Sequence, residues 1–207
     1  ASPGERFRAA LDAERPLQVA GVINAYAALL AERAGFKALY LSGAGVANAS
    51  FGLPDLGVTN LAEVCEDARR ITSRTDLPLL VDADTGFGGL LNLRRTVRGY
   101  EAAGVQAIQL EDQVSPKKCG HTQGRQVIPM AEMCQKIAVA VEARRSTDTL
   151  IIARTDARTA LGLDAAAFGQ CLDSGRYSHL VESDLAAGQG YGVSGTPAFF
   201  VNGRPLV

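Results

Sequence analysis

Five short apolar runs alternate with helical patterns, and this alternation constrains the fold more than any other feature of the chain. The runs are Gln18–Asn24, Ala38–Ser42, Leu79–Asp84, Ala107–Glu111 and Leu150–Arg154. Between them, apolar residues recur at helical spacing in Ala25–Ala34, Leu61–Thr72, Leu91–Ala103 and Met130–Arg145. This pattern predicts parallel βα units, and the near-continuous apolar strands predict a sheet covered by helices on both faces. We therefore expect an α/β fold.

The ends of the expected helices carry residues that helix ends favour. Asn60 stands just before Leu61, with Glu63 three residues further on, which predicts a helix start. Gly35 and Gly104 fall where two helices should end, a position that glycine suits because it tolerates positive φ.

Carboxylates close two of the expected strands. Asp82 and Asp84 are spaced two apart, so both side chains should point the same way from a strand. Glu111 and Asp112 end another strand. Active sites of α/β barrels lie at this end of the strands, and Mg²⁺ is held there by a few carboxylates with water. The pattern predicts a Mg²⁺ site, with helix capping as the alternative.

A cluster of reactive side chains follows Glu111. Lys117–His121 reads Lys-Lys-Cys-Gly-His, which places Cys119 among two lysines and a histidine. A thiol beside cationic groups can move protons near neutral pH. Cys119 is therefore a candidate acid, and an incidental loop thiol is the alternative.

At these residues the chain resembles the isocitrate and methylisocitrate lyases of the isocitrate lyase and phosphoenolpyruvate mutase superfamily. Four segments carry the resemblance: Tyr40–Gly45 as a substrate-carboxylate loop, Asp82–Gly88 as a metal strand, Lys117–His121 as the catalytic loop and Ala153–Ala157 as a further substrate strand. The resemblance runs from about Phe7 to about Ala166 and implies a carbon–carbon lyase with Mg²⁺ as cofactor.

The resemblance also implies where metal and substrate bind. Asp82 and Asp84 would hold Mg²⁺, with Glu111 as a supporting carboxylate. Substrate contacts are expected from Ser42, Gly43, Ala44, Asp55, Gly120 and Arg154. For Asp55, a turn aspartate is the alternative.

The catalytic roles implied by the resemblance fall on four residues. Cys119 would be the general acid, tuned by the neighbouring lysines and His121. Tyr40 or Arg154 would be the base or the partner of an oxyanion, and the sequence does not separate these two. The expected reaction cleaves a small hydroxy-tricarboxylate, 2-methylisocitrate, to pyruvate and succinate. The alternatives are a relative of phosphoenolpyruvate mutase or oxaloacetate decarboxylase, and a catalytically silent hybrid or binding protein.

The last part of the chain resembles a different class of protein. From Phe168 onward, and most clearly in Gly192–Pro205 with Thr196-Pro197, the chain is similar to the C-terminal part of thioredoxin-fold disulfide oxidoreductases, although no Cys-x-x-Cys is present. We expect a helix near Tyr177–Gly188 and one strand, Ala198–Val201, in this part. We expect two parts: residues 1–166 as a truncated TIM-barrel-like lyase unit and residues 167–207 as a thioredoxin-like fragment. Eight βα units need roughly 250 residues, so a truncated barrel should be impaired in activity.

Charge and cysteine usage narrow the expected partners. A net charge of −1 gives no electrostatic reason to bind nucleic acid or an anionic membrane. No apolar run reaches the about 18 residues that cross a bilayer. Four widely spaced cysteines are typical of reduced thiols rather than a disulfide framework. We expect a cytoplasmic enzyme, with homo-oligomerisation as an open option.

Overall fold

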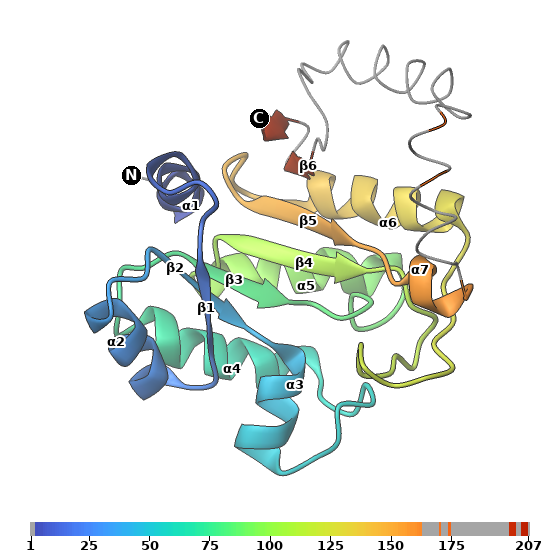
Figure 1. Ribbon diagram of the computed structural model, residues 1–207, viewed down its shortest axis with the longest axis horizontal. Coiled ribbons are helices and arrows are strands. Elements are labelled where there is room, and N and C mark those ends of the chain that lie inside the picture. Colours follow the sequence, from blue (N-terminus) through green and yellow to red (C-terminus); the bar gives the residue numbers. More distant parts are fainter. Residues whose placement is uncertain (1–2, 163–169, 171–173, 175–198, 202–203, 207) are drawn as a thin grey trace.

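The computed structural model describes residues 3–162, 170, 174, 199–201 and 204–206. Five strands form one parallel sheet in the order β1-β2-β3-β4-β5 (Figure 1). The strands are β1 (Val19–Val22), β2 (Ala38–Leu41), β3 (Leu79–Asp82), β4 (Ala107–Glu111) and β5 (Leu150–Arg154). The predicted α/β fold with parallel βα units is confirmed, and the first three strands end before the apolar runs do.

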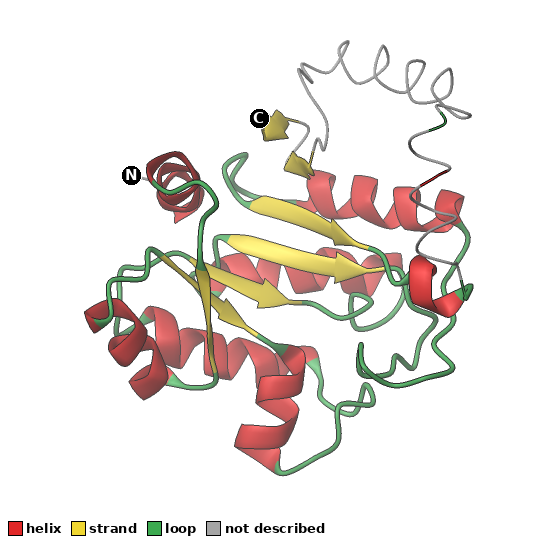
Figure 2. Ribbon diagram, in the orientation of Figure 1, coloured by secondary structure: helices red, strands yellow, loops and turns green. Residues whose placement is uncertain are grey.

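The four predicted helices are present between the strands (Figure 2). They are α2 (Ala25–Arg33), α4 (Leu61–Thr72), α5 (Leu90–Ala102) and α6 (Met130–Ala143). Asn60 and Glu63 form a capping box at the start of α4, because each side chain accepts a hydrogen bond from the other residue's backbone N–H. Gly35 and Gly104 follow α2 and α5 with φ of 92° and 80°, as predicted.

Several short elements were not predicted. These are α1 (Pro3–Ala13), α3 (Gly43–Gly45), the π-helix η1 (Val46–Ser50), α7 (Ala157–Ala160) and β7 (Arg204–Leu206). Most of them are too short to carry a readable period, which needs a window of about 11–18 residues. Helix α3, η1 and α7 all follow the carboxyl ends of strands, where they shape the candidate site (Figure 1).

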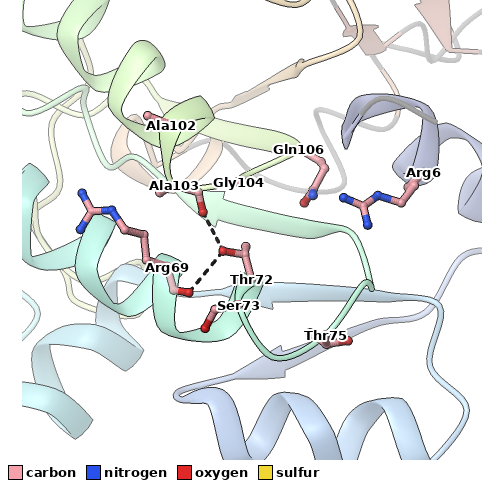
Figure 3. Close-up of a pocket in the computed structure, with 9 residues that line it drawn as sticks. All are labelled: Arg6, Arg69, Thr72, Ser73, Thr75, Ala102, Ala103, Gly104 and Gln106. Atoms are coloured by element: carbon pink, nitrogen blue, oxygen red, sulfur yellow. Dashed lines mark hydrogen bonds between the residues drawn. The ribbon is translucent and has the colours of Figure 1, made fainter.

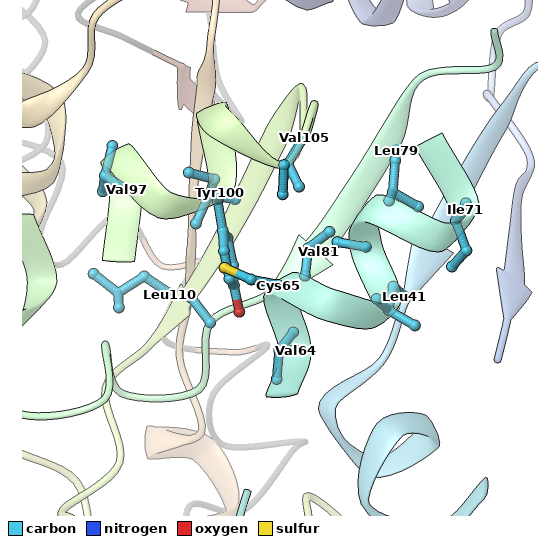
Figure 4. Close-up of a cluster of buried hydrophobic side chains, with 14 of the residues drawn as sticks. Leu41, Val64, Cys65, Ile71, Leu79, Val81, Val97, Tyr100, Val105 and Leu110 are labelled. Atoms are coloured by element: carbon cyan, nitrogen blue, oxygen red, sulfur yellow. The ribbon is translucent and has the colours of Figure 1, made fainter. Parts of the chain in front are cut away.

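The main hydrophobic core lies between one face of the sheet and α2, α4, α5 and α6. Strand residues such as Leu41, Val81 and Leu110 pack there against Cys65 and Tyr100 (Figure 4). Each of these side chains is almost fully buried. Burying a large apolar side chain contributes about 1.5–3 kcal/mol, so this face supplies most of the packing free energy.

The second face of the sheet is covered differently from the prediction of helices on both sides. A smaller cluster joins Phe7 of α1 to Ala38, Ala107 and Leu150 at the starts of the strands. Alternation along the strands places Tyr40 and Gln109 on the same face, nearer the carboxyl ends, and both are only partly buried. A sheet that curls as in a barrel lines its inner face with side chains rather than helices.

The C-terminal strands form a separate sheet among the described residues. Strand β6 (Phe199–Val201) pairs antiparallel with β7, so the strand expected at 198–201 is present. The expected helix at 177–188 and the Thr196-Pro197 pair lie outside the described residues, and the thioredoxin-like assignment stays a prediction. Within the described part of the chain, none of the helices is both long and apolar enough to cross a membrane.

Candidate active site

Asp82 is the centre of the candidate site, at the carboxyl end of β3. Its Oδ2 accepts hydrogen bonds from the Tyr40 hydroxyl at 3.2 Å and from the Gly43 N–H at 3.4 Å. Its Oδ1 accepts from the Asp84 N–H at 2.9 Å. The Tyr100 hydroxyl donates to the Asp82 backbone oxygen at 2.7 Å. These bonds fix a carboxylate that is only 5% exposed.

Asp84 lies close to Asp82 but is not part of the same strand, contrary to the prediction from the sequence. The strand ends at Asp82, and Asp84 lies in the following turn with φ of 47°, so the alternation argument for this residue is wrong. The two carboxylates nevertheless converge on Gly43. A Cβ added to Gly43 would lie 3.0 Å from Asp84 Oδ1 and 3.4 Å from Asp82 Oδ2. Glycine therefore keeps the space beside both carboxylates open.

Glu111 and Arg154 face each other from neighbouring strands because β4 and β5 pair them in register. Arg154 Nη1 lies 3.5 Å from Glu111 Oε2, and Arg154 Nη2 lies 3.3 Å from Asp156 Oδ2. A Cβ added to Gly120 would lie 2.6 Å from Arg154 Nη2. The guanidinium is thus enclosed by two carboxylates and the backbone of Gly120.

Lys117 has a different place from the one expected. Its ammonium lies 2.9 Å from Asp84 Oδ1 and also contacts Asp55 Oδ1. The three side chains are 6%, 7% and 9% exposed, so these are buried ion pairs. Asp55, expected among the substrate contacts, is engaged with this lysine. A small polar pocket of about 300 Å³ opens beside Asp84 and Lys117, with Phe87 in its wall.

Cys119 lies in residues 114–126, which we call the thiol loop. Its Sγ is 3.7 Å from His121 Nδ1. The ammonium of Lys118 instead donates to the Gly124 carbonyl oxygen at 3.0 Å. Of the two lysines and the histidine that the sequence placed around the thiol, His121 is the one that contacts it in the described part of the chain.

Some polar groups of the predicted carboxylate-binding loop, Tyr40–Gly45, already form hydrogen bonds within the protein. The Gly43 N–H is used by Asp82, and the Ala44 carbonyl oxygen accepts from Asn48 Nδ2 at 2.7 Å. Ser42 precedes α3, and its hydroxyl makes no capping hydrogen bond. Of the hydrogen-bonding groups named here, the Ser42 hydroxyl is therefore the one best placed to meet a ligand.

Crowded carboxylates shift the ionisation of the site. Burial and the neighbouring Asp82 raise the pKa of Asp84 to about 6, against the opposing effect of Lys117. The same two causes raise the pKa of Glu111 to about 7, against Arg154. Burial and Asp82 also raise the pKa of Tyr40. For Arg154, burial lowers the pKa, but nearby carboxylates outweigh it and the net shift is upward. Tyr40 and Arg154 therefore both keep their protons at neutral pH.

The residues present fit a hard divalent cation. Glu111 is 2% exposed, and its Oε1 has no hydrogen-bond partner among the described residues. The buried carboxylates of Asp82 and Asp84 converge beside Gly43, and oxygen donors are those that Mg²⁺ prefers. In the described ranges, no three Asp, Glu, His or Cys side chains stand close enough to hold a metal between them. Mg²⁺ would therefore use one or two carboxylates and several waters.

The shifted pKa of Glu111 predicts how stability depends on pH without metal. Its pKa is about 7 in the folded chain against an ordinary value of 4.5. Between these values the folded state keeps a proton that the unfolded state loses, so the free energy of unfolding should fall as pH rises from 5 to 7. One proton is worth about 1.4 kcal/mol per pH unit at most. Urea unfolding in EDTA at pH 5, 6, 7 and 8 measures this slope.

Glu111→Gln should flatten that slope by about 1 kcal/mol per pH unit. The matched control is Glu132→Gln, which changes an exposed glutamate on α6 in the same way. Equal slopes in the wild type and in Glu111→Gln would show that Glu111 does not titrate in this window.

Sequence reasoning missed Gln109 and Gln113, and it did not predict the hydrogen bonds of Asp112. Gln109 donates to the Tyr40 hydroxyl at 3.3 Å, and Asp112 accepts hydrogen bonds from Thr155 Oγ1 and the Asp156 N–H. Gln113 links Asp156 to the thiol loop. All of these lie in or next to the segments that were singled out, so position at the end of a strand was the signal that could have found them.

A second pocket lies at the opposite end of the sheet and contains none of the predicted site residues. It has a volume of about 360 Å³ and is bordered by Arg6, Arg69 and Gln106 (Figure 3). In the wall of this pocket, Thr72 Oγ1 donates to the carbonyl oxygens of Ala103 at 2.7 Å and Arg69 at 3.4 Å. Active sites of barrels lie at the other end of the strands, so this pocket is set apart from the candidate site.

Comparison with known families agrees with this geometry. Residues 7–179 match the family model described as phosphoenolpyruvate phosphomutase. The chain belongs to the phosphoenolpyruvate phosphomutase family. The matched range passes residue 166, where the lyase-like part was expected to end. The resemblance to the superfamily is thus confirmed over most of the chain.

Individual members of the phosphoenolpyruvate phosphomutase family are closely similar to this chain. A 2-methylisocitrate lyase of Shewanella oneidensis is 56% identical over 164 residues, which cover 79% of this chain and 56% of that protein. The chain thus spans just over half the length of this curated relative. The crystal structure of a phosphoenolpyruvate phosphomutase from Streptomyces platensis subsp. rosaceus matches with a TM-score of 0.72 and 37% identity, over 76% of this chain and 55% of that one.

Another solved structure bears on the cofactor. A phosphonopyruvate hydrolase in complex with oxalate and Mg²⁺ matches with a TM-score of 0.70 and 36% identity, over 79% of this chain and 56% of that chain. A member of the superfamily therefore binds Mg²⁺ together with a small dicarboxylate.

Proposed function

We propose that this chain is a Mg²⁺-dependent carbon–carbon lyase that cleaves 2-methylisocitrate to pyruvate and succinate. The observation that carries the proposal is the packing of the thiol loop, at Gly120, against Arg154 beside the carboxylate cluster. Arg154 thus lies between the thiol loop and the carboxylate of Glu111, which supports a site that combines a proton donor, a cation and oxygen ligands. The identity of 56% to a relative named 2-methylisocitrate lyase supports the choice of substrate.

Asp82 and Asp84 would hold Mg²⁺ with the help of water, and Glu111 would support the site as a nearby carboxylate. When bound, the ion would act as a Lewis acid toward the hydroxy-acid half of the substrate and take up negative charge. The residues around it have their own tasks. Gly43 keeps the space next to the carboxylates free, and Lys117 balances part of the charge of Asp84.

Arg154 and Tyr40 are assigned to binding negative charge. Arg154 is a bidentate cation suited to a substrate carboxylate, and its position is set by Glu111 and Asp156. Tyr40 keeps its proton because burial and Asp82 raise its pKa. A protonated hydroxyl donates to an oxyanion and does not act as a base, so between the two roles left open by the sequence we assign Tyr40 the oxyanion role.

Cys119 is assigned the final proton transfer. As the carbon–carbon bond breaks, an ionised carboxylate of the site takes the proton of the substrate hydroxyl, and the carbon that bears this oxygen becomes the carbonyl carbon of pyruvate. The electron pair of the broken bond passes to the carbon next to a carboxylate of the departing half. The Cys119 thiol gives its proton to that carbon and becomes a thiolate, which the adjacent His121 can stabilise.

A coupled assay of pyruvate release tests the proposed function. Purified chain, Mg²⁺ and 2-methylisocitrate should release pyruvate, and EDTA should abolish the release. Phosphoenolpyruvate is the comparison substrate, because the family model bears the name of a phosphomutase. Turnover of phosphoenolpyruvate alone would favour that second function, and no turnover of either would favour the silent hybrid.

Mg²⁺ itself should stabilise the folded chain. A ligand that binds only the folded state at 100 times its Kd adds about 2.7 kcal/mol to the free energy of unfolding. We expect Mg²⁺ to raise Tm, and Asp82→Asn or Asp84→Asn to remove most of that increase. The matched control is Asp76→Asn, at the opposite end of the sheet, where the carboxylate pairs with Arg6. The same Mg²⁺-dependent increase in all variants would exclude the site.

A further inference from the structure

Resting on the proposed function, we infer that Gln113 is a positioning residue that fixes the thiol loop relative to Arg154. Gln113 is 1% exposed and lies two residues beyond β4. Its side-chain hydrogen bonds go to Lys118 and Asp156, not to the thiol or to the carboxylates expected to bind Mg²⁺. Its hydrogen bonds instead join the loop that carries Cys119 to the residue that orients Arg154.

The thiol loop leaves and returns at one point of the fold. Gln113 forms an antiparallel bridge with Val127, and the Val114 N–H donates to the Gln126 carbonyl oxygen at 2.8 Å. These backbone contacts close the ends of the loop. They leave the position of its middle, where Cys119 lies, to side-chain contacts.

The amide of Gln113 reaches into the middle of the loop. Its Oε1 accepts the Lys118 N–H at 3.0 Å, and its Nε2 donates to the Lys118 carbonyl oxygen at 3.0 Å. The second hydrogen of Nε2 serves Asp156 Oδ2 at 2.9 Å. An amide has two donors and an acceptor and can make all three bonds at once, whereas a carboxylate lacks the donors. Both backbone groups of the residue before Cys119 are therefore held by one buried side chain.

Asp156 extends this connection to the substrate side of the site. Its carboxylate accepts from Gln113 and also lies 3.3 Å from Arg154 Nη2. The same guanidinium packs against Gly120, the residue that follows Cys119. The residues on both sides of the thiol are thus connected to Arg154. Lys118 is connected through Gln113 and Asp156, and Gly120 contacts the guanidinium directly.

Arg125 holds the loop from its other side. It is 7% exposed, and its Nη1 donates to the carbonyl oxygens of Thr122 at 2.8 Å and of Gly120. This contact stays within the loop and does not reach Arg154. Lys117 also anchors the loop, through Asp55 and Asp84, but this contact leads away from Arg154. Gln113 is therefore the residue whose loss should free residues 118–122 relative to Arg154.

Hydrogen exchange followed by mass spectrometry tests the inference. Gln113→Leu removes the amide and keeps an apolar side chain of similar size. Peptides covering residues 117–122 should exchange about tenfold faster, because two or three hydrogen bonds are lost. Peptides from β4 and α5 should be unchanged. The matched control, Gln126→Leu, makes the same change at an exposed position where the loop closes and should leave exchange as in the wild type.

A second pair of variants covers the case in which Gln113→Leu does not fold. Gln113→Glu removes the donors and sets a carboxylate against Asp156, so loop exchange should rise. Adding Asp156→Asn restores a donor between the two side chains. The loop of this double variant should exchange at least threefold more slowly than the loop of Gln113→Glu.

The outcomes separate the inference from the proposed function. Unchanged loop exchange in Gln113→Leu, or an equal increase over the whole chain, would overturn the positioning role. Exchange is measured without substrate, so it decides on Gln113 even if the wild type releases no pyruvate, a result that would count against the lyase proposal alone. Where the wild type turns over, Gln113→Leu should lower kcat about tenfold, in step with the loss of loop order.

Discussion

Replacing Lys117 by methionine is expected to lower the free energy of unfolding by about 3–5 kcal/mol, because it leaves buried carboxylates without their cation. The ammonium of Lys117 contacts both Asp55 and Asp84, and all three side chains are more than nine-tenths buried. Methionine is close to lysine in length, so packing around the stem is retained and the loss reports on charge. Urea unfolding at pH 8 in EDTA measures it, since Asp84, with a pKa of about 6, is then ionised.

Lys118 provides the matched control for this prediction. It is the next residue in the chain, it is exposed, and its ammonium donates to a backbone carbonyl rather than to a carboxylate. Lys118→Met should change the free energy of unfolding by less than about 0.5 kcal/mol. Adding Asp55→Asn to Lys117→Met should recover part of the loss, because one of the unpaired charges is removed. Equal destabilisation by the two lysine variants would show that Lys117 does not hold the carboxylates.

The order and type of the main elements followed from local pattern in the sequence. The apolar runs predicted the five strands, and the capping box at Asn60 was readable because both of its partners are local. The boundary of β3 was not readable, since Asp82 and Asp84 keep the spacing of a strand while the backbone turns between them. The spacing of polar and apolar residues alone does not reveal a residue with left-handed backbone angles, such as Asp84.

The sequence predicted which strands carry the site residues better than it predicted which side chains contact one another. Each of these residues lies at the carboxyl end of its own strand, so parallel topology was enough to bring Tyr40, Asp82, Glu111 and Arg154 to one edge. The partner of Lys117 could not be predicted in the same way. Its nearness to Cys119 in sequence suggested one role, and the folded loop turns the ammonium toward Asp55 and Asp84 instead. Side-chain direction within a loop depends on contacts distant in sequence.

Replacing Cys119 by serine is expected to reduce pyruvate release by at least about 10²-fold, the usual loss when a general acid is removed. A hydroxyl is close to a thiol in shape but is a far weaker acid, so it cannot supply the proton to the departing carbon. Folding should be unaffected, because Cys119 is only partly buried and its side chain contacts His121 of the same loop. The matched control is Cys134→Ser, which changes an exposed thiol on α6 and should keep full turnover.

The loss in Cys119→Ser should fall on kcat and not on KM. A residue that acts only when the bond breaks stabilises the transition state without contributing to binding of the substrate. The carboxylate cluster and Arg154 are left intact, so the Mg²⁺-dependent increase in Tm should persist in this variant. A raised KM with unchanged kcat would place Cys119 among the binding residues. Turnover within about threefold of the wild type would remove it from the proposed mechanism and leave the acid to be sought among the protonated groups, such as Tyr40, which donates to the Asp82 carboxylate.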